Sequence, residues 1–489
     1  MGCTSKNNHP NIIFILVDDL GWNDVGYMGS KFYDTPNIDR LAAEGIYFTQ
    51  AYAAAAICSP TRASILTGRY PARIGITDWI RGRYSGVTIP EDKKNPAGYE
   101  EHADSIPLIT PVNPWWMEHS EITLAELMKE AGYTTVHIGK WHLGPKPWSP
   151  LDQGYGHNIG GEDYGQPPTY FDPYERNGFK IESLPGRKEG EYLTDRESDE
   201  AVRFINENAD NPFFMSLSHY AVHTPLMAKP EYIRKFESRL ESDPAIPPWT
   251  DDDEVPARFL SRIPLEHQKN PTYAAMIKSV DDGVGHILHA LDSLGIAEQT
   301  ILVFFSDNGG HIVSTSNAPL RLGKGHPYEG GIRVPLIFRW PGNIQPGTQS
   351  ETMVISNDFF PTLLNLVGLT VPDSLQIDVT DVSPVLRGES NLLERNALYW
   401  HFPHYWWGTK VSPYSIIRQD DWKLIRWYES GTVELYNLKD DLSETYNLAT
   451  DHPDIVQQLS ESLDNWLKNV NARMPVPNPG NTIEYYNTE

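Results

Sequence analysis

Two uninterrupted apolar runs that lie far apart in the chain constrain the fold most. Residues 11–17 read Asn-Ile-Ile-Phe-Ile-Leu-Val, and residues 300–305 read Thr-Ile-Leu-Val-Phe-Phe. Neither run alternates with polar residues, which is typical of parallel strands that are buried on both faces of a sheet. Short oxygen-bearing side chains follow at once, Asp18-Asp19 after the first run and Ser306-Asp307-Asn308 after the second. The runs therefore predict two strands of a buried sheet with polar residues at their carboxyl ends.

Helical patterns alternate with further strand candidates along the chain. Residues 35–45 carry a helix start, a helical pattern and a stopping glycine, and residues 123–132 add a Thr–Glu capping box. The other expected helices cover 194–208 and 273–294, and the other expected strands cover 134–139, 213–218 and 334–338. This alternation predicts an α/β fold with a large, mostly parallel central sheet flanked by helices.

The pattern changes towards the C-terminus. Short strand candidates at 415–418, 422–427 and 434–437 are separated by turn residues, and a helix candidate follows at 453–471. We therefore expect a main α/β domain at 10–390 and a smaller α+β unit with an antiparallel sheet at 391–489. The proline-rich end after Arg473 is expected to form an extended strap. Segments rich in Pro, Gly and charge are expected to be long loops that shape a site, at 85–120, 144–190 and 228–270.

The charge of the chain limits its partners. It carries 40 Lys and Arg against 65 Asp and Glu, a formal net charge of −25. Such a chain repels nucleic acid and anionic membrane surfaces, so a nucleic-acid partner is not expected. No apolar run is long enough to predict a transmembrane span. The start, Met-Gly-Cys-Thr-Ser-Lys, is similar to the remnant of a bacterial lipoprotein signal, which favours an exported periplasmic or outer-membrane lipoprotein over a cytoplasmic protein.

One short block carries the strongest functional signal. Residues 58–69 read Cys-Ser-Pro-Thr-Arg-Ala-Ser-Ile-Leu-Thr-Gly-Arg. This block resembles the signature of the formylglycine-dependent (type I) sulfatases of the alkaline phosphatase superfamily. The resemblance implies that a formylglycine-generating or anaerobic sulfatase-maturing enzyme oxidises Cys58 to formylglycine (3-oxoalanine). The resemblance further implies that one hydroxyl of the hydrated aldehyde attacks sulfur and displaces the alcohol. The other hydroxyl then loses its proton, and the covalently bound sulfate is expelled as the aldehyde reforms. The alternative is an ordinary buried thiol.

The polar residues at the two strand ends suggest a metal site. Ligand sites in open α/β sheets lie at the carboxyl ends of the strands. The candidates offer only oxygen donors, which suit Ca²⁺ or Mg²⁺ better than Zn²⁺: Asp18, Asp19, Asp307 and Asn308. The sulfatase resemblance implies that these four bind Ca²⁺, with the oxygen of modified Cys58 as a further ligand. Helix capping or turn formation by Asp and Asn is the alternative.

Further blocks match the resemblance in order along residues 10–370. Gly-Lys-Trp-His at 139–142 follows a strand candidate and implies that Lys140 and His142 contact the sulfate and the nucleophile. In an extended segment their i, i+2 spacing would place both on one side. His223, two residues before a proline, is the implied general acid to the leaving alkoxide, and His219 is its competitor.

Three more residues complete the implied catalytic set. Lys324, in the block 323–335, is the implied bridge between the sulfate and the leaving oxygen. Arg62 is expected to orient formylglycine through a charge-assisted hydrogen bond. His311 follows Asn308 closely and is expected to lie just outside the metal ligands.

Aromatic and polar residues outline an expected sugar site. Asp78, Trp79 and Arg81 follow the nucleophile block, and they are candidates to bond hydroxyls or hold a second anion. His401 and His404 belong to the block His-Phe-Pro-His-Tyr-Trp-Trp, for which stacking on a sugar ring and plain interdomain packing are both open. The region is similar to sulfatases that act on galactose or N-acetylgalactosamine units. We therefore expect a bacterial, exo-acting glycan sulfatase with a sulfated carbohydrate as substrate.

Two rival functions stay open. A phosphatase or phosphodiesterase of the same superfamily would use Ser or Thr and a two-metal cluster, for which no second ligand set is evident. A non-catalytic glycan-binding relative would have lost Cys58 or the Lys/His set, and neither is lost.

Overall fold

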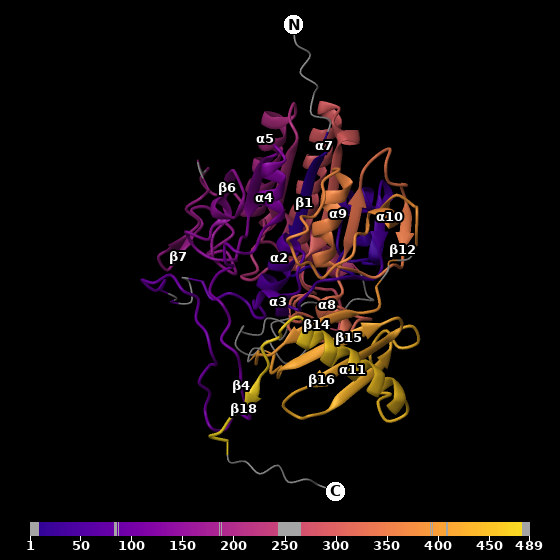
Figure 1. The fold of residues 1–489 in the computed structure, drawn as a ribbon. Helices are drawn as coiled ribbons and strands as arrows, with labels where there is room; N and C mark the ends of the chain where they lie inside the picture. Colours follow the sequence, from indigo (N-terminus) through magenta and orange to yellow (C-terminus); the bar gives the residue numbers. More distant parts are fainter. Residues whose placement is uncertain are drawn as a thin grey trace.

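A central sheet organises the computed structural model, which describes residues 9–82, 86, 88–184, 186, 188–242, 266–391, 393, 395–406 and 409–481. Eight of the described strands form this sheet in the order β12-β2-β11-β10-β1-β9-β5-β6 (Figure 1). In that order they are Thr348–Ser350, Ile46–Phe48, Leu336–Arg339, Thr300–Ser306, Asn11–Val17, Phe213–Ser218, Thr134–Gly139 and His157–Ile159. The two apolar runs are β1 and β10, which pair in parallel from Asn11 opposite Thr300 to Val17 opposite Ser306.

The sheet is mostly parallel, as predicted. β1 pairs in parallel with β9, β9 with β5, and β5 with β6. The exception is β11, which runs antiparallel to both β10 and β2. The apolar pattern at 334–338 revealed a buried strand, but burial alone does not encode the direction in which a strand runs.

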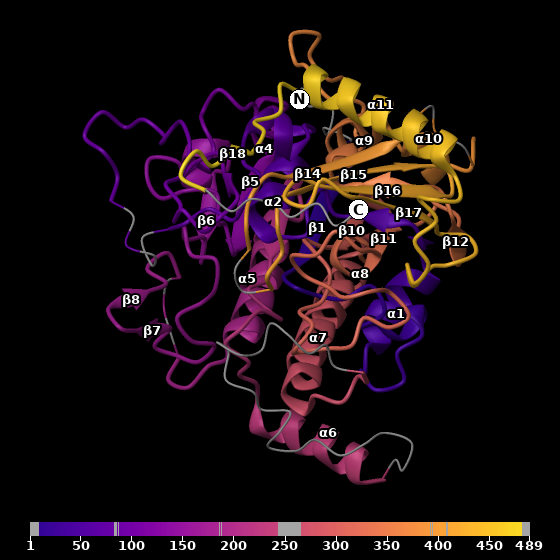
Figure 2. The ribbon, with the colours of Figure 1, turned by 90° about the horizontal axis from the view of Figure 1, so that it is seen from below.

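Helices cover both faces of the sheet (Figure 2). Along β1, Ile13, Ile15 and Val17 pack into a core with α1, α5 and α7, while Ile12, Phe14 and Leu16 pack into a second core with α2, α4, α9 and α10. These helices are α1 (Pro36–Ala43), α2 (Cys58–Thr67), α4 (Leu124–Glu130), α5 (Leu193–Asn208), α7 (Pro271–Leu294), α9 (Phe359–Leu366) and α10 (Ser383–Leu386). Burial on both sides explains why β1 shows no polar alternation.

A second, antiparallel sheet lies below the first in Figure 1. Its order is β14-β15-β16-β17, with bounds Leu398–Phe402, Tyr414–Gln419, Trp422–Trp427 and Val433–Asn437, and α11 (Pro453–Asn469) packs against it. We call these elements the C-terminal unit. Its core continues into the larger part of the molecule through residues around the Cys58 block, Tyr52, Ala54, Ala56 and Ile57. The predicted strap forms a short ladder, in which β18 (Val476–Pro477) pairs with β4 (Leu108–Ile109).

Shorter elements join the two sheets and fill the connections. They include α3 (Pro71–Ile74), α8 (Glu329–Ile332), β3 (Ala51–Tyr52), β13 (Val354–Ile355), β7 (Glu175–Arg176) and β8 (Phe179–Lys180). The segment 228–270, expected as a loop, contains a helix, α6 (Pro230–Ser242). Residues 243–265 and the Gly-Cys start with Cys3 lie outside the described residues. Within the described ranges, none of the helices combines the length and the apolar character that crossing a membrane requires.

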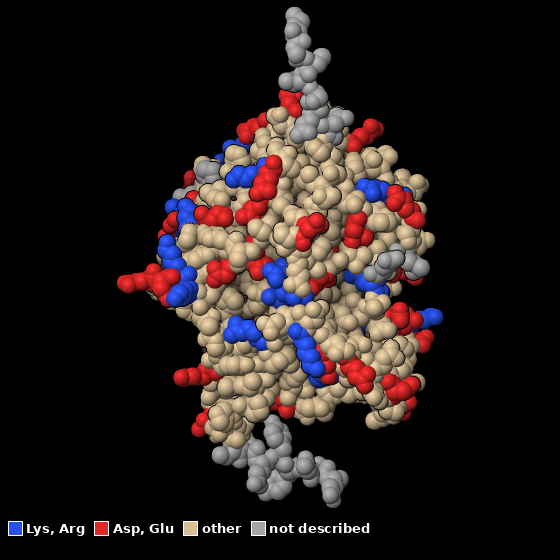
Figure 3. Space-filling model, viewed as in Figure 1, with Lys and Arg blue, Asp and Glu red and all other residues tan. Residues whose placement is uncertain are grey.

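The charged side chains are not segregated on the face shown in Figure 3. Acidic and basic groups are interspersed, and Lys and Arg side chains gather at mid-height, where the upper and lower parts of the molecule meet. On this face, several basic side chains of an acidic chain thus lie near the boundary of the two sheets, with acidic side chains among them.

Candidate active site

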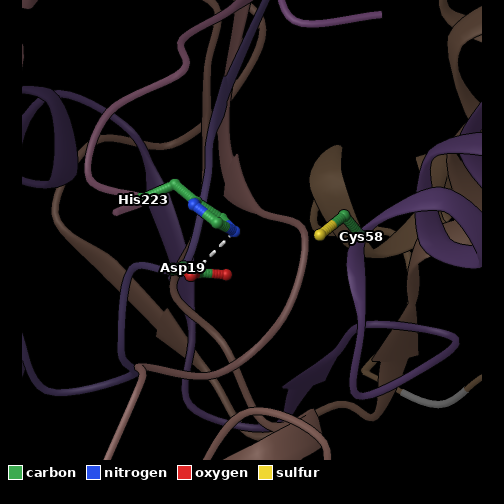
Figure 4. Close-up of side chains that lie close together, drawn as sticks. All are labelled: Asp19, Cys58 and His223. Carbon is green, nitrogen blue, oxygen red and sulfur yellow. Dashed lines mark ion pairs between the residues drawn. The ribbon is translucent and has the colours of Figure 1, made fainter. Parts of the chain in front are cut away.

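Cys58 is the first residue of α2 and is buried, with 3% of its surface exposed. Its sulfur lies within 4.8 Å of ligand atoms of Asp19 and His223, and within the same distance of carboxylate oxygens of Asp18 and Asp307. Figure 4 shows this sulfur directed towards the Asp19–His223 pair. Burial raises the pKa of the thiol to about 11, although Lys140 and Lys324 oppose the shift. An unmodified Cys58 is therefore a protonated, weak nucleophile at neutral pH.

The polar residues after β1 and β10 come together because these strands end side by side. The ladder closes with Val17 opposite Ser306, so Asp18 and Asp307 leave the sheet at the same level. Asp19 takes a left-handed backbone conformation, with φ of 62°. Its N–H donates to Asp307 Oδ1 at 3.2 Å, and Asn308 Nδ2 donates to Asp19 Oδ1 at 2.8 Å. The left-handed turn thus brings adjacent side chains to one site, which a continuing strand would not allow.

Three cations face the three carboxylates. Lys140 Nζ lies 2.6 Å from Asp18 Oδ2, and Lys324 Nζ lies 2.5 Å from Asp19 Oδ1. The Arg62 guanidinium lies 2.8 Å from Asp307 Oδ2 and donates to the Lys140 carbonyl. All six groups are buried. The opposite charges therefore compensate each other in a region that excludes water.

The carboxyl groups respond differently to this setting. Burial and the neighbouring charge of Asp307 raise the pKa of Asp18 well above its usual range, outweighing Lys140. Burial also acts to raise the pKa of Asp19, but Lys324 and His223 hold it below its usual range. One oxygen of this set, Asp18 Oδ1, is buried and accepts no hydrogen bond from a described residue, and the same holds for Asn308 Oδ1.

These two unsatisfied oxygens provide a test for a metal ion. A buried oxygen without a donor is costly unless something else coordinates it. Both oxygens belong to the four residues singled out at the strand ends, and the whole donor set is hard. The residues present therefore fit a divalent cation of the Ca²⁺ or Mg²⁺ type.

His142 is held as a neutral ring with one open nitrogen. Its Nε2 lies 2.9 Å from the Ile80 carbonyl, which only accepts hydrogen bonds, so Nε2 carries the proton. Nδ1 is buried and has no hydrogen-bond partner among the described residues. Burial and the charges of Lys140 and Arg62 hold the pKa of His142 well below its usual range. His142 also has φ of 58°, so the extended geometry assumed for the i, i+2 argument is wrong.

His223, rather than His219, stands beside Cys58. His223 Nδ1 lies 2.8 Å from the Thr224 carbonyl, which leaves Nε2 facing Asp19 Oδ2 at 3.7 Å (Figure 4). Burial and Lys324 hold its pKa well below its usual range. His219 is fully buried, and its Nδ1 lies 2.7 Å from Glu197 Oε2. His311 is near Asp19 and pairs with Ser314, and burial lowers its pKa to about 4.

The expected sugar-binding residues after the nucleophile block, Asp78, Trp79 and Arg81, follow each other close to His142, and we call them the rim. The Trp79 ring is 6.5 Å from the His142 ring, and the Arg81 guanidinium is 6.0 Å from the centre of Trp79. Arg81 also lies 3.7 Å from Glu100. Asp78 is almost fully buried, which raises its pKa to about 7. These contacts connect the rim to the histidine of the Gly-Lys-Trp-His block.

The two histidines of the aromatic block, His401 and His404, have different hydrogen-bond partners. His404 Nε2 lies 2.8 Å from Thr77 Oγ1, next to the rim, and burial lowers its pKa to about 3. His401 Nδ1 lies 2.7 Å from Ser415 Oγ, and its Nε2 lies 3.1 Å from the Arg473 carbonyl. Both ring nitrogens of His401 are thus engaged within the protein, as in the packing interpretation of this block.

Trp406 belongs to the aromatic block at 401–407, but the sequence analysis named only His401 and His404 of that block as site residues. Its ring lies on the backbone of Gly325, where an added Cβ would come within 1.6 Å of Cζ3. Gly325 has φ of 84°, and its N–H donates to the Ala56 carbonyl close to Cys58. The indole therefore lies against the segment that carries Lys324. The available signal was the glycine after Lys324 together with the aromatic run at 401–407, but nothing in the sequence paired them.

Comparisons with known proteins agree with this arrangement. Residues 10–369 match the family model "Sulfatase", and residues 322–472 match "N-sulphoglucosamine sulphohydrolase, C-terminal". A curated "Sulfatase" of Formosa agariphila is 32% identical over 95% of this chain and 90% of its own length. Human N-acetylgalactosamine-6-sulfatase is 31% identical over 83% of this chain and 73% of its own length.

A solved structure resembles the whole molecule. The crystal structure of Ps i-CgsB in complex with k-i-k-neocarrahexaose has a TM-score of 0.75 and 30% identity, and the match covers 94% of this chain and 93% of that one. The family match includes Cys58 and the residues gathered around it. The chain therefore belongs to the sulfatase family.

Proposed function

We propose that this protein hydrolyses the sulfate ester of a sulfated sugar or of an oligosaccharide derived from a polysaccharide. The observation that carries this proposal is the buried cluster in which Arg62, Lys140 and Lys324 surround Cys58. A sulfate ester is a compact anion, and fixed cations in a water-excluding site bind such a group strongly. The names of two relatives support a sugar substrate, because one is an N-acetylgalactosamine-6-sulfatase and the other was crystallised with k-i-k-neocarrahexaose.

Two groups belong to the proposed active form. Asp18, Asp19, Asp307 and Asn308 would hold Ca²⁺, which supplies positive charge for the sulfate oxygens and favours an ionised hydroxyl. Cys58 would be oxidised to formylglycine by a maturation enzyme, and the hydrated aldehyde supplies a nucleophilic hydroxyl that a protonated thiol does not. The position at the first turn of α2 suits this role, because a helix N-terminus favours negative charge.

The remaining residues position the ester and move protons. Lys140 and Lys324 are charged side chains aimed at the carboxylates beside Cys58, and they can turn to the sulfate oxygens when an ester enters. Arg62 is fixed by Asp307 and by a carbonyl, so it orients residue 58. His142 offers an unprotonated Nδ1 that can accept a proton or a hydrogen bond.

His223 is the proposed general acid. Its Nδ1 donates to the Thr224 carbonyl, so Nε2 is the nitrogen that can deliver a proton. In the free protein Lys324 and Lys140 help to keep the ring neutral. A bound sulfate ester adds negative charge beside them, which raises the pKa of His223 and lets it carry the proton that a sugar alkoxide needs.

The leaving sugar would lie on the rim. Trp79 lies beside His142, and Trp406 lies against Gly325 next to Lys324, so both aromatic side chains are near the site, while Arg81 and His404 offer polar contacts. Aromatic faces pack against the apolar side of sugar rings, while polar groups fix their hydroxyls. Asp78 is the further hydroxyl acceptor. We propose His401 as a residue that supports this rim from behind, since both of its ring nitrogens are bonded within the protein.

The proposal is tested by following one peptide and one product. The peptide containing Cys58 should show the mass loss of thiol-to-aldehyde conversion when the chain is produced beside a maturation enzyme. That protein should release sulfate from a defined panel of sulfated monosaccharides and disaccharides. Full activity from protein whose Cys58 is unmodified would refute the formylglycine assignment. Hydrolysis of phosphate monoesters of the same sugars, but of none of the sulfated saccharides, would refute the function. Because such glycans are extracellular polymers, we also propose that the protein is exported.

A further inference from the structure

The C-terminal unit carries a pocket away from Cys58. Its volume is about 550 Å³, and it lies between α11 and residues at the ends of β14 and β15. Figure 2 shows α11 on the outer side of the antiparallel sheet. None of the residues placed in the active site lines this pocket.

The pocket has an uncharged, hydrogen-bonding lining. Its polar walls are five carboxamides and a hydroxyl, Asn396, Gln419, Gln458, Ser462, Asn465 and Asn469. The four that belong to α11 follow each other at spacings of three or four residues, so they share one helix face. Charged residues make up 21% of the chain, yet none lines this pocket. The lining thus provides paired donors and acceptors without a charge to select an ion.

The remaining wall is aromatic. The rings of Tyr399 and Trp466 stack at 4.8 Å with an angle of 5° between their planes, and the Tyr70 ring meets Trp466 edge-on at 5.2 Å. Trp466 is 8% exposed, and its Nε1–H is buried without a hydrogen-bond partner among the described residues. The aromatic part of the lining is therefore packed against the protein, with only its edge open to the pocket.

We propose that this pocket is a second saccharide-binding site, which holds an uncharged stretch of the glycan whose sulfated unit enters the Cys58 site. The choice of ligand rests on the proposed function. Carboxamides suit neighbouring sugar hydroxyls because each offers both a donor and an acceptor, and an aromatic edge suits the apolar side of the ring. A sulfated unit does not fit here, because the pocket offers no cation to compensate its charge.

A second site of this kind changes how the enzyme treats long chains. Once one part of a glycan is held on the C-terminal unit, its sulfated unit reaches the active site at a raised effective concentration. A short sulfated sugar cannot use both sites. The inference therefore concerns affinity for the polymer and leaves the chemistry at Cys58 unchanged.

Binding of unsulfated oligosaccharides tests the proposal. The probes are unsulfated hexasaccharides built on galactose or N-acetylgalactosamine, titrated calorimetrically into full-length protein. The pocket variant is Gln458→Ala with Asn465→Ala, two exposed side chains that make no hydrogen bond with a described residue. The control is Gln457→Ala with Glu461→Ala, two exposed residues of α11 that bond each other and do not line the pocket.

At least one probe should bind the unaltered protein. The pocket variant should weaken that binding about tenfold, since each lost hydrogen bond costs several-fold in affinity, while the control should bind as the unaltered protein does. The proposal is overturned if no probe binds, or if the pocket variant binds as tightly as the control. Sulfate release from sulfated monosaccharides by the unaltered protein is measured separately. Its failure would refute the proposed function, whereas binding of the unsulfated probes reports on the pocket alone.

Discussion

Substitution of Lys423 tests how strongly a buried ion-pair cluster joins the C-terminal unit to the segment that carries Lys324. It lies in β16 with its side chain fully buried, 3.0 Å from Glu329 Oε1 and 2.8 Å from Glu444 Oε1. Glu329 begins α8, directly after the segment that carries Lys324. The substitution Lys423→Met keeps the length and apolar body of the side chain but removes its charge. It leaves two buried carboxylates without their shared cation.

The expected loss in the free energy of unfolding follows from the burial of Lys423 and its two carboxylate partners. Removing one partner of a buried ion pair typically costs about 3–5 kcal/mol, because the other charge stays buried and unpaired. At about 2.1 cal/mol/K per residue, unfolding of 489 residues has an entropy near 1 kcal/mol/K, so the melting temperature should fall by about 3–5 °C. The matched control is Lys468→Met, an exposed lysine of α11, which should change stability by less than about 0.5 kcal/mol.

The stability lost through Lys423→Met should also depend on pH. Burial raises the pKa of Glu444 from 4.5 to about 7, against the opposing charge of Lys423. Between about pH 4.5 and 7, Glu444 is therefore protonated in the folded protein but ionised in the unfolded chain. Stability contributed by this group falls as pH rises through that window. Without Lys423 the pKa rises further, so calorimetric unfolding should show a larger penalty at pH 8 than at pH 6.

Neutralising Glu444 should restore stability to the Lys423→Met variant. Glu444→Gln combined with Lys423→Met removes the carboxylate that lost its paired cation, while Glu329 keeps its contacts with Arg333 and Tyr52. The double variant should recover most of the lost stability at pH 8. A loss below about 1 kcal/mol, or the same loss at both pH values, would refute the reasoning.

Three further predictions concern the active site. Asp307→Ala should abolish calcium binding and activity together, and a chelator should lower the melting temperature of the unaltered protein but not that of this variant. His223→Ala should slow glycan sulfate hydrolysis by about 10²–10⁴-fold and affect an activated aryl sulfate far less, since a nitrophenolate needs no acid; equal losses would make His223 a sulfate-positioning residue. Trp406→Ala should raise KM for sulfated oligosaccharides about tenfold without changing turnover of the aryl ester; an unchanged KM would remove Trp406 from the sugar site.

The sequence predicted the structure best where one physical constraint dominates. β1, β9 and β5 have the predicted bounds, because continuous burial leaves a continuous apolar pattern. The capping box at Thr123 and Glu126 is present as expected, since both residues act locally. The convergence at the ends of β1 and β10 was also predictable, because it follows from parallel pairing.

Features that depend on contacts distant in sequence were not predictable in the same way. The direction of β11 is decided by its neighbours β10 and β2, and its composition carries no trace of it. The left-handed conformation of His142 is invisible in a Lys-x-His spacing. Trp406 and Gly325 meet although 80 residues separate them, and the partners of His401 come from two distant segments. Local patterns report burial and capping, whereas the sugar rim is assembled by tertiary packing.

Sulfate release by matched proteins tests the central claim most directly. The unaltered chain and Cys58→Ala, each produced beside a maturation enzyme, are incubated with the same sulfated galactose and N-acetylgalactosamine saccharides, and free sulfate is measured by ion chromatography. We expect sulfate release by the unaltered chain and none above background by Cys58→Ala, with both proteins folded and binding calcium. Equal sulfate release by the two proteins would contradict it.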